Sequence, residues 1–149
     1  MKSLFDKIES EKLIQRSSII WAETKPLWGS MNAAEMFYHC NFTNKQVLEG
    51  NKIKRKSTFK EYALKIFALY LKPEFPKNIK GLKRNDAKGK ISIEEFETQK
   101  KEFADIVRQI SEHKKEIMTT HPKFGNLSQN EWGKALWKHL DHHLRQFGV

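Results

Sequence analysis

A chain of 149 residues is long enough for one domain with a buried core and too short for two ordinary ones, so we expect a single domain over residues 1–149. Hydrophobic residues make up 38% of it and charged residues 31%, with seven glycines and four prolines, which excludes fibrous and disordered chains and favours helices. The net charge of +10 suggests an anionic partner, but residues 52–90 hold thirteen Lys/Arg against three Asp/Glu, so this one stretch carries the whole excess.

The sequence offers no sign of export or of a membrane span. Residues 1–18 mix both charge signs and lack the continuous apolar run of a signal peptide. The most apolar run, residues 62–71, has about half of the roughly 20 residues that a span needs, and it contains Lys65. The single cysteine, Cys40, cannot form an internal disulfide bond. We therefore expect a cytoplasmic protein without a membrane span.

Two helices are predicted in the first third of the chain. Apolar residues at helical spacing predict a first helix over residues 2–22, and Pro26 follows it. Asn32 can cap a second helix while Glu35, three residues later, reaches back to it in a capping box. This second helix is predicted to end at Gly50.

The basic middle of the chain is predicted to contain one helix and one long loop. A third helix is expected over residues 58–71, because its apolar positions recur at helical spacing and Pro73 stops it. Residues 72–92 show no sustained period and contain two prolines and two glycines, so we expect a surface loop there. Ser92 can cap a fourth helix, predicted over residues 93–118.

The last predicted helix covers residues 129–147 and opens with a capping box formed by Ser128 and Glu131. No alternation of useful length predicts a strand. Long helices with short links, together with one long basic loop, predict an all-α fold of the up-and-down helix-bundle type.

The final helix contains three of the six histidines. His139 and His143 are four residues apart, so they lie on one face of a helix, about 6 Å apart along its axis. Histidine pairs at this spacing hold zinc in H-E-x-x-H helices. His142 points about 100° away from His143. The apolar stripe through Trp132 and Leu136 continues through His139 and His143, which favours that pair as metal ligands.

A metal site needs at least one further protein ligand, because a catalytic zinc commonly has three of them and an open position. In a helix bundle this ligand should come from another helix. The remaining histidines, His39, His113 and His121, are the candidates. His113 lies among charged residues, which favours a solvated side chain. His39 lies within the capped amphipathic helix, where a lone buried histidine is more often a hydrogen-bonded core residue than a metal ligand. The residues alone leave this choice open.

Three further residues are candidates for supporting roles. Metal-bound imidazoles usually donate their second N–H to a carboxylate or a carbonyl. Glu35 lies one turn before His39, although its capping role explains it equally well. Gln146 follows His143 by about one turn. His121 is a candidate catalytic proton donor at the mouth of a cavity, or a loop histidine that fixes the turn before the last helix.

Two stretches resemble a known family. The sequence WGSMNAAEMFYHCNFT at residues 28–43 and the C-terminal 121–149, with its string H-x-x-H-H-L-R-Q-F-G, are similar to the DinB/YfiT-like superfamily of metalloenzymes, in the branch catalogued as a domain of unknown function. The resemblance implies a DinB-type four-helix bundle, often dimeric, with a divalent metal bound by one histidine of the second helix and an H-x-x-x-H pair of the last. These positions correspond to His39, His139 and His143.

The resemblance also implies the chemistry. Characterised relatives include thiol S-transferases and isomerases that use low-molecular-weight thiols, so we expect a small-molecule substrate. From the same resemblance we expect zinc or nickel, or else manganese or iron, as the metal, and a homodimer. Three neutral ligands leave the charge of the dication intact, which suits it to activate water or a thiol for a transferase or hydrolase reaction. Two alternatives remain: a nucleic-acid-binding module using residues 52–90, and a bundle whose metal is purely structural or absent.

Overall fold

The computed structural model describes residues 2–50, 55–78 and 85–149, and all regular elements in these ranges are helical. They comprise five α-helices, a π-helical turn η1 and a 3₁₀ turn η3. In chain order they are α1 (Lys7–Ser18), α2 (Ala33–Glu49), α3 (Phe59–Ile66), η1 (Phe67–Leu71), η3 (Ile93–Glu95), α4 (Phe96–Ser111) and α5 (Gln129–Gln146). The predicted all-α class is confirmed.

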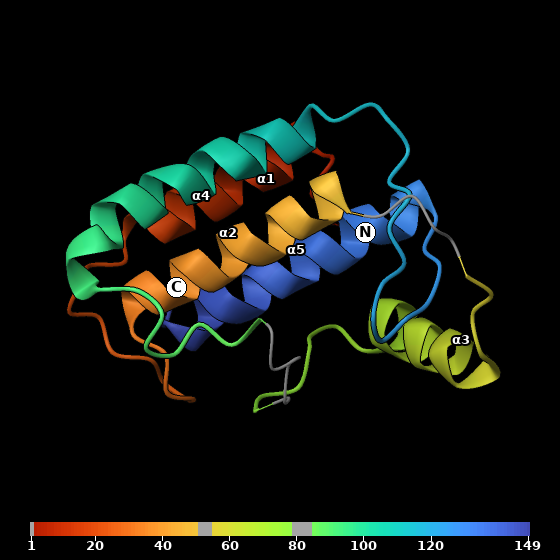
Figure 1. The fold of residues 1–149 in the computed structure, drawn as a ribbon, viewed down its shortest axis with the longest axis horizontal. Coiled ribbons are helices and arrows are strands. Elements are labelled where there is room, and N and C mark those ends of the chain that lie inside the picture. Colours follow the sequence, from red (N-terminus) through yellow and green to blue (C-terminus); the bar gives the residue numbers. More distant parts are fainter. Residues whose placement is uncertain (1, 51–54, 79–84) are drawn as a thin grey trace.

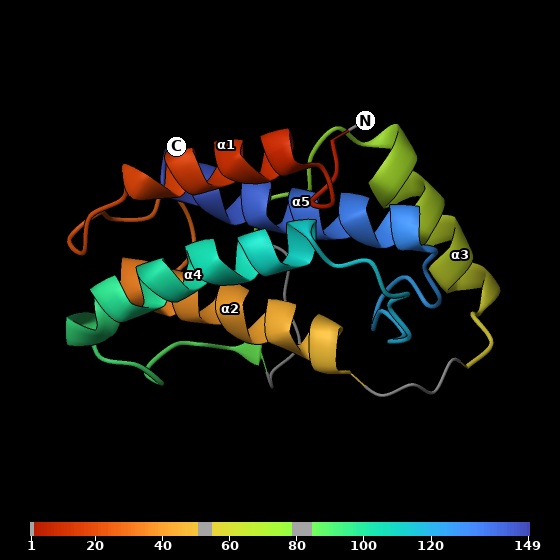
Figure 2. The same cartoon turned by 90° about the horizontal axis from the view of Figure 1, so that it is seen from above.

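Helices α1, α2, α4 and α5 run side by side, whereas α3 stands apart (Figures 1 and 2). Helix α4 packs against both α1 and α2, and α5 packs against the same two helices. The shared core contains Phe37 of α2, Phe103 of α4, and Trp132 and Leu140 of α5. Helix α3 lies across one end of this arrangement, near the beginning of α5.

Capping boxes set the starts of the helices that carry the site. Asn32 Oδ1 accepts a hydrogen bond from the backbone N–H of Glu35 at 2.9 Å, and the Glu35 carboxylate accepts one from the N–H of Asn32 at 2.8 Å. Ser128 and Glu131 form the same reciprocal pair at the start of α5. The predicted starts of both helices are confirmed, because such boxes depend only on residues three positions apart.

Two predicted helices are shorter in the structure. The helix predicted over residues 2–22 is limited to α1, because Asp6 Oδ1 accepts hydrogen bonds from the N–H groups of Ile8 and Glu9 and so starts the helix there. The helix predicted over 93–118 ends at Ser111. Its buried stripe stops at Ile110, since residues 111–116 are polar or charged and none of them is buried.

Two lysines connect α3 and η1 to the rest of the molecule. Lys65 Nζ lies 2.9 Å from the carboxylate of Glu131, and Lys138 Nζ donates to the carbonyl oxygens of Ala68 (2.7 Å) and Lys72. The carbonyls at the end of a helix lack partners within it, so Lys138 of α5 supplies a donor for η1. Of the predicted loop at 72–92, residues 79–84 lie outside the described part, and 72–78 contain no helix.

None of the helices in the described ranges has the length and apolarity required to cross a bilayer.

Candidate metal centre

Helices α2 and α5 bring three histidines together. His39 lies near the middle of α2, while His139 and His143 lie one turn apart on α5. One ring nitrogen from each residue lies within 4.8 Å of those of the other two. His39 Nε2 and His139 Nε2 are 3.1 Å apart. These three residues can hold a metal ion, and they are the set that the histidine spacing and the family resemblance predicted.

The tautomer of His39 is fixed by a backbone carbonyl. Its Nδ1 lies 2.7 Å from the carbonyl oxygen of Asn85, in the segment that precedes α4. A carbonyl oxygen can only accept, so Nδ1 carries the proton and the lone pair lies on Nε2, toward His139. His39 therefore presents the nitrogen that a metal requires.

Gln146 fixes His143 in the same way. Its side-chain Nε2 donates to the carbonyl oxygen of Trp28 at 2.7 Å, which leaves Oε1 to accept from His143 Nδ1–H at 2.9 Å. A Cβ on Gly29 would come within 2.6 Å of Gln146 Nε2, and Gly29 has a φ of +81°. Glycine at this position therefore lets the loop approach Gln146 closely.

The spacing of the donors suits a transition metal. With its lone pair on Nε2, His39 accepts a hydrogen bond from His139 when that ring carries its proton on Nε2, and a cation can take the place of that proton. A zinc ion with Zn–N bonds of about 2.0–2.1 Å and tetrahedral angles holds its ligand nitrogens about 3.3 Å apart. The His39–His139 distance is close to that value, and the third ligand nitrogen lies within 4.8 Å of these two, so the donor set of three imidazoles suits a zinc-like ion.

Burial keeps the three imidazoles neutral. It lowers the pKa of His143 to about 3, with a further contribution from the charge of His39. Burial, and then the charges of the neighbouring histidines, hold the pKa of His139 well below its usual range. Burial also lowers the pKa of His39, although the carbonyl of Asn85 and the charge of Asp86 oppose the shift. Protons therefore do not compete with a metal for these nitrogens near neutral pH.

His121 has a fixed tautomer of its own. Its Nδ1 accepts hydrogen bonds from the backbone N–H groups of Lys123 and Phe124, both at 3.1 Å, so the neutral ring carries its proton on Nε2. The ring stacks on Phe124 with centroids 4.2 Å apart. Burial lowers its pKa to about 4, and the charge of Lys123 adds to the shift. The predicted turn-fixing role is present in these contacts, and the ring also lines the cavity described below.

Glu35, the other expected neighbour of His39, is used elsewhere. Besides its capping contact, its Oε1 accepts a hydrogen bond from the N–H of Gly89 at 2.6 Å. The polar partner of His39 is the carbonyl of Asn85 instead. Sequence reasoning missed Asn85 because a backbone oxygen 46 positions away leaves no signal in a side-chain pattern.

His142 is more enclosed than its place off the core stripe suggested. The loop before α2 brings Trp28 against it, with ring centroids 5.7 Å apart, and its ring also lies 5.2 Å from that of His143. Burial lowers the pKa of His142. His142 thus forms part of the wall beside the metal ligands.

The buried thiol of Cys40 contacts the sulfur of Met36 at 3.8 Å. Burial raises its pKa, so the thiol stays protonated and is no ligand.

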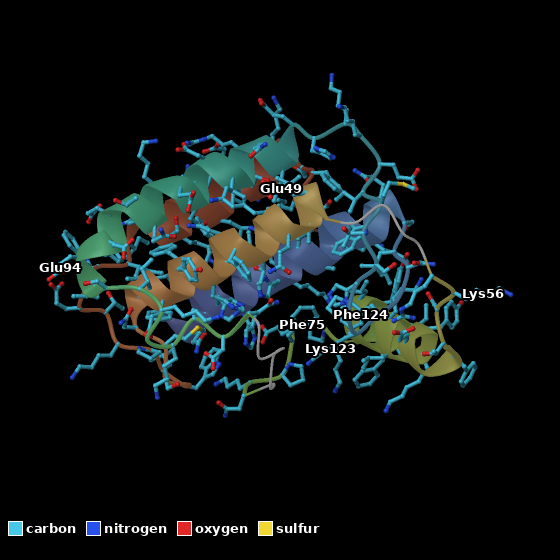
Figure 3. All side chains as sticks on the ribbon, viewed as in Figure 1. Glu49, Lys56, Phe75, Glu94, Lys123 and Phe124 are labelled. Carbon is cyan, nitrogen blue, oxygen red and sulfur yellow. The ribbon has the colours of Figure 1, made fainter. Side chains whose placement is uncertain are left out.

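A cavity of about 1290 Å³ extends from the three histidines toward α3. His121 and His142 line it, and its apolar wall includes Phe67, Phe75 and Phe124. Phe75 and Phe124 lie together on the side of the molecule near α3 (Figure 3), with ring centroids 6.2 Å apart. The volume is large enough for a small organic molecule beside the histidines.

Fold and site together define a class: an all-helical protein in which two helices hold three histidines at the wall of a large cavity. A family model described as "Protein of unknown function (DUF1569)" matches residues 3–148. The chain belongs to that family. No curated protein and no solved structure gives a significant match. The reaction must therefore be inferred from the site.

Proposed function

We propose that this protein is a divalent-metal-dependent enzyme of the DinB type, with α1, α2, α4 and α5 as its four-helix bundle. His39, His139 and His143 hold the metal, which is zinc or nickel, or else manganese or iron. The observation that carries the proposal is the convergence of three neutral imidazoles, two of them with their second nitrogen fixed by a hydrogen bond, at the wall of a cavity. We further propose that the protein is cytoplasmic, as the sequence indicates, and that it forms a homodimer, as the family resemblance implies.

The substrate is a small molecule that enters the cavity, and a low-molecular-weight thiol fits the family resemblance. With three neutral ligands and an open position, a dication supplies activation of bound water or of a bound thiol. The reaction is then a thiol transfer or a hydrolysis.

The residues around the metal have separate roles. Asn85 O and Gln146 hold two ligand rings in orientation. The Nε2–H of His121 is available as a hydrogen-bond donor to a substrate oxygen, because its Nδ1 is committed to the turn. The aromatic wall excludes water from the apolar part of the substrate.

The first experiment is elemental analysis by mass spectrometry of protein purified without a histidine tag or chelator, beside His139→Ala and His143→Ala. We expect about one transition metal per chain in the wild type and none in the folded variants. Thiol-transfer and hydrolytic substrates are then screened with the loaded protein. A wild type that stays metal-free after incubation with zinc, nickel and manganese contradicts the proposal.

The two alternatives are distinguishable. A structural metal has no exchangeable water, and its removal lowers stability without loss of any activity. A nucleic-acid module predicts binding to random DNA that weakens steeply with salt. The nucleic-acid alternative is disfavoured because two cations of the basic stretch, Arg55 and Lys65, are already paired with Glu61 and Glu131.

A further inference from the structure

Most of the large apolar side chains of α3 and η1 face solvent, while Ala68 and Leu69 of η1 are buried in the core. Phe59 is 87% exposed and Leu71 69%, and Tyr62, Phe67 and Tyr70 are each between 42% and 54% exposed. Phe59 and Tyr62 lie about one turn apart in α3, and Phe67, Tyr70 and Leu71 follow in the π-helical turn η1. Soluble proteins seldom expose so many large apolar side chains within one short segment, and such a patch typically marks an interaction site.

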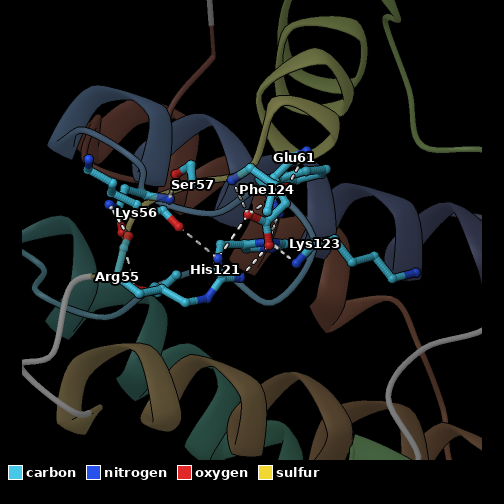
Figure 4. A network of polar contacts seen from close by, with 10 residues as sticks. Arg55, Lys56, Ser57, Glu61, His121, Lys123 and Phe124 are labelled. Carbon is cyan, nitrogen blue, oxygen red and sulfur yellow. Dashed lines mark hydrogen bonds and ion pairs between the residues drawn. The ribbon is translucent and has the colours of Figure 1, made fainter.

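Polar contacts hold α3 with its polar side toward the rest of the protein. Lys65 and Glu131 form an ion pair whose side chains are only 11% and 12% exposed. At the start of α3, Ser57 Oγ accepts a hydrogen bond from the N–H of Asn126 at 2.7 Å, and Glu61 pairs with Arg55 (Figure 4). The polar side therefore faces the protein, which leaves the apolar side outward.

Exposed lysines flank α3 and η1 in the chain. Lys56 and Lys60 lie at the beginning of α3, and Lys72 directly follows η1. The Nζ of Lys72 lies 5.3 Å from the ring centroid of Phe67, so cation and aromatic face occupy the same surface. An apolar stripe bordered by cations is complementary to a partner that offers both anionic groups and an apolar interior.

A second copy of this chain does not offer that combination. A two-fold symmetric interface brings the same patch of both copies together, so two sets of exposed lysines would gather in one interface. The aliphatic Leu71 also contributes no stacking surface for nucleic acid bases, which bind aromatic platforms. An anionic bilayer meets both requirements, since phosphates attract the lysines and the acyl boundary takes up the stripe.

We propose that α3 and η1 dock the protein on anionic lipid bilayers, with Phe59, Tyr62, Phe67, Tyr70 and Leu71 inserted at headgroup depth and the lysines against lipid phosphates. The inference goes beyond the proposed enzymatic function and does not depend on a metal. Because Phe67 also lines the cavity, the docked face adjoins the cavity wall.

The test is flotation of the full-length protein with vesicles of phosphatidylcholine containing about 30% phosphatidylglycerol, beside pure phosphatidylcholine vesicles. We expect binding to the anionic vesicles that weakens with salt, and about a tenfold or larger loss in the double variant Phe59→Ser/Leu71→Ser. Lys56→Glu/Lys60→Glu should lose the preference for anionic lipid. Ile8→Ser is the matched control, because Ile8 is 69% exposed and belongs to α1 and not to α3 or η1.

Four outcomes overturn the proposal. The first is a wild type that does not float with anionic vesicles, and the second is an equal loss in Ile8→Ser. In the third, sedimentation velocity finds a dimer that Phe59→Ser/Leu71→Ser abolishes, which assigns the face to a second copy. Binding to single-stranded DNA in place of vesicles likewise contradicts it. Circular dichroism of each variant separates these results from unfolding, and metal analysis of the double variant reports independently on the enzyme proposal.

Discussion

Gln146 connects the candidate metal centre to the loop that carries Trp28. Because it orients His143, the variant Gln146→Leu should weaken zinc affinity by about 10–100-fold while retaining all three ligands. Competition with a chromogenic zinc chelator measures the affinity. The matched control is Gln15→Leu at an exposed position of α1, which should bind as the wild type does. Equal affinities in Gln146→Leu and the wild type would exclude a positioning role.

His121 should make stability depend on pH. Its pKa is about 4 in the folded state and near 6.5 when unfolded, so between these values the unfolded chain binds a proton that the folded chain does not. The free energy of unfolding therefore falls as the pH falls from 6.5 to 4, by at most about 1.4 kcal/mol per pH unit from this group. Urea unfolding of metal-free protein across this range should give a shallower dependence for His121→Gln. An unchanged dependence would contradict the assignment.

At the scale of the elements, Lys138 decides how η1 is attached to α5. Lys138→Met keeps most of the aliphatic side chain but removes the donor to Ala68 O and Lys72 O, leaving carbonyls without a charged partner. We expect a loss of about 2–3 kcal/mol in the free energy of unfolding. Lys101→Met is the control, because Lys101 forms only an exposed pair with Asp105 and should cost less than about 1 kcal/mol. A loss of similar size in both variants would show that the contact of Lys138 with η1 contributes no more to the free energy of unfolding than an exposed ion pair does.

How well each element could be predicted follows from how local its determinants are. The starts of α2 and α5 were predictable because Asn32 and Ser128 cap within three residues. The end of α4 at Ser111 was not, since it depends on where the packed surface of its neighbours stops. The apolar side of α3 resembles a core-facing stripe in sequence, and polar contacts to distant residues, among them the ion pair of Lys65 with Glu131, turn it outward.

For the whole molecule, a metal that binds only the folded state must raise thermal stability. At a free zinc concentration of 100 times the dissociation constant, the gain is about 2.7 kcal/mol, or roughly 5–11 °C in Tm for a chain of this size. Differential scanning calorimetry with and without zinc measures the shift. His139→Ala should show no shift, while His113→Ala, outside the cluster, should match the wild type. A zinc-induced rise in His139→Ala would place the metal elsewhere.

The candidate site could be predicted only in part, because only some of its determinants are local in the sequence. His139 and His143 follow helical geometry and could be paired from spacing alone. Choosing His39 needed the family resemblance, because no local rule relates α2 to α5. The carbonyl of Asn85 and the cavity depend on how distant segments pack, and no residue pattern predicts them.

The long separation in sequence between the two ligand-bearing helices would affect the kinetics of metal binding. His39 and His139 lie 100 positions apart, so a metal that joined them in an unfolded chain would have to close a very long loop. Such a closure is entropically costly and is only repaid once α2 and α5 are already packed. Under the proposed function, metal loading would follow folding, and the ion would act as a late crosslink that slows the separation of the two helices without guiding their first encounter.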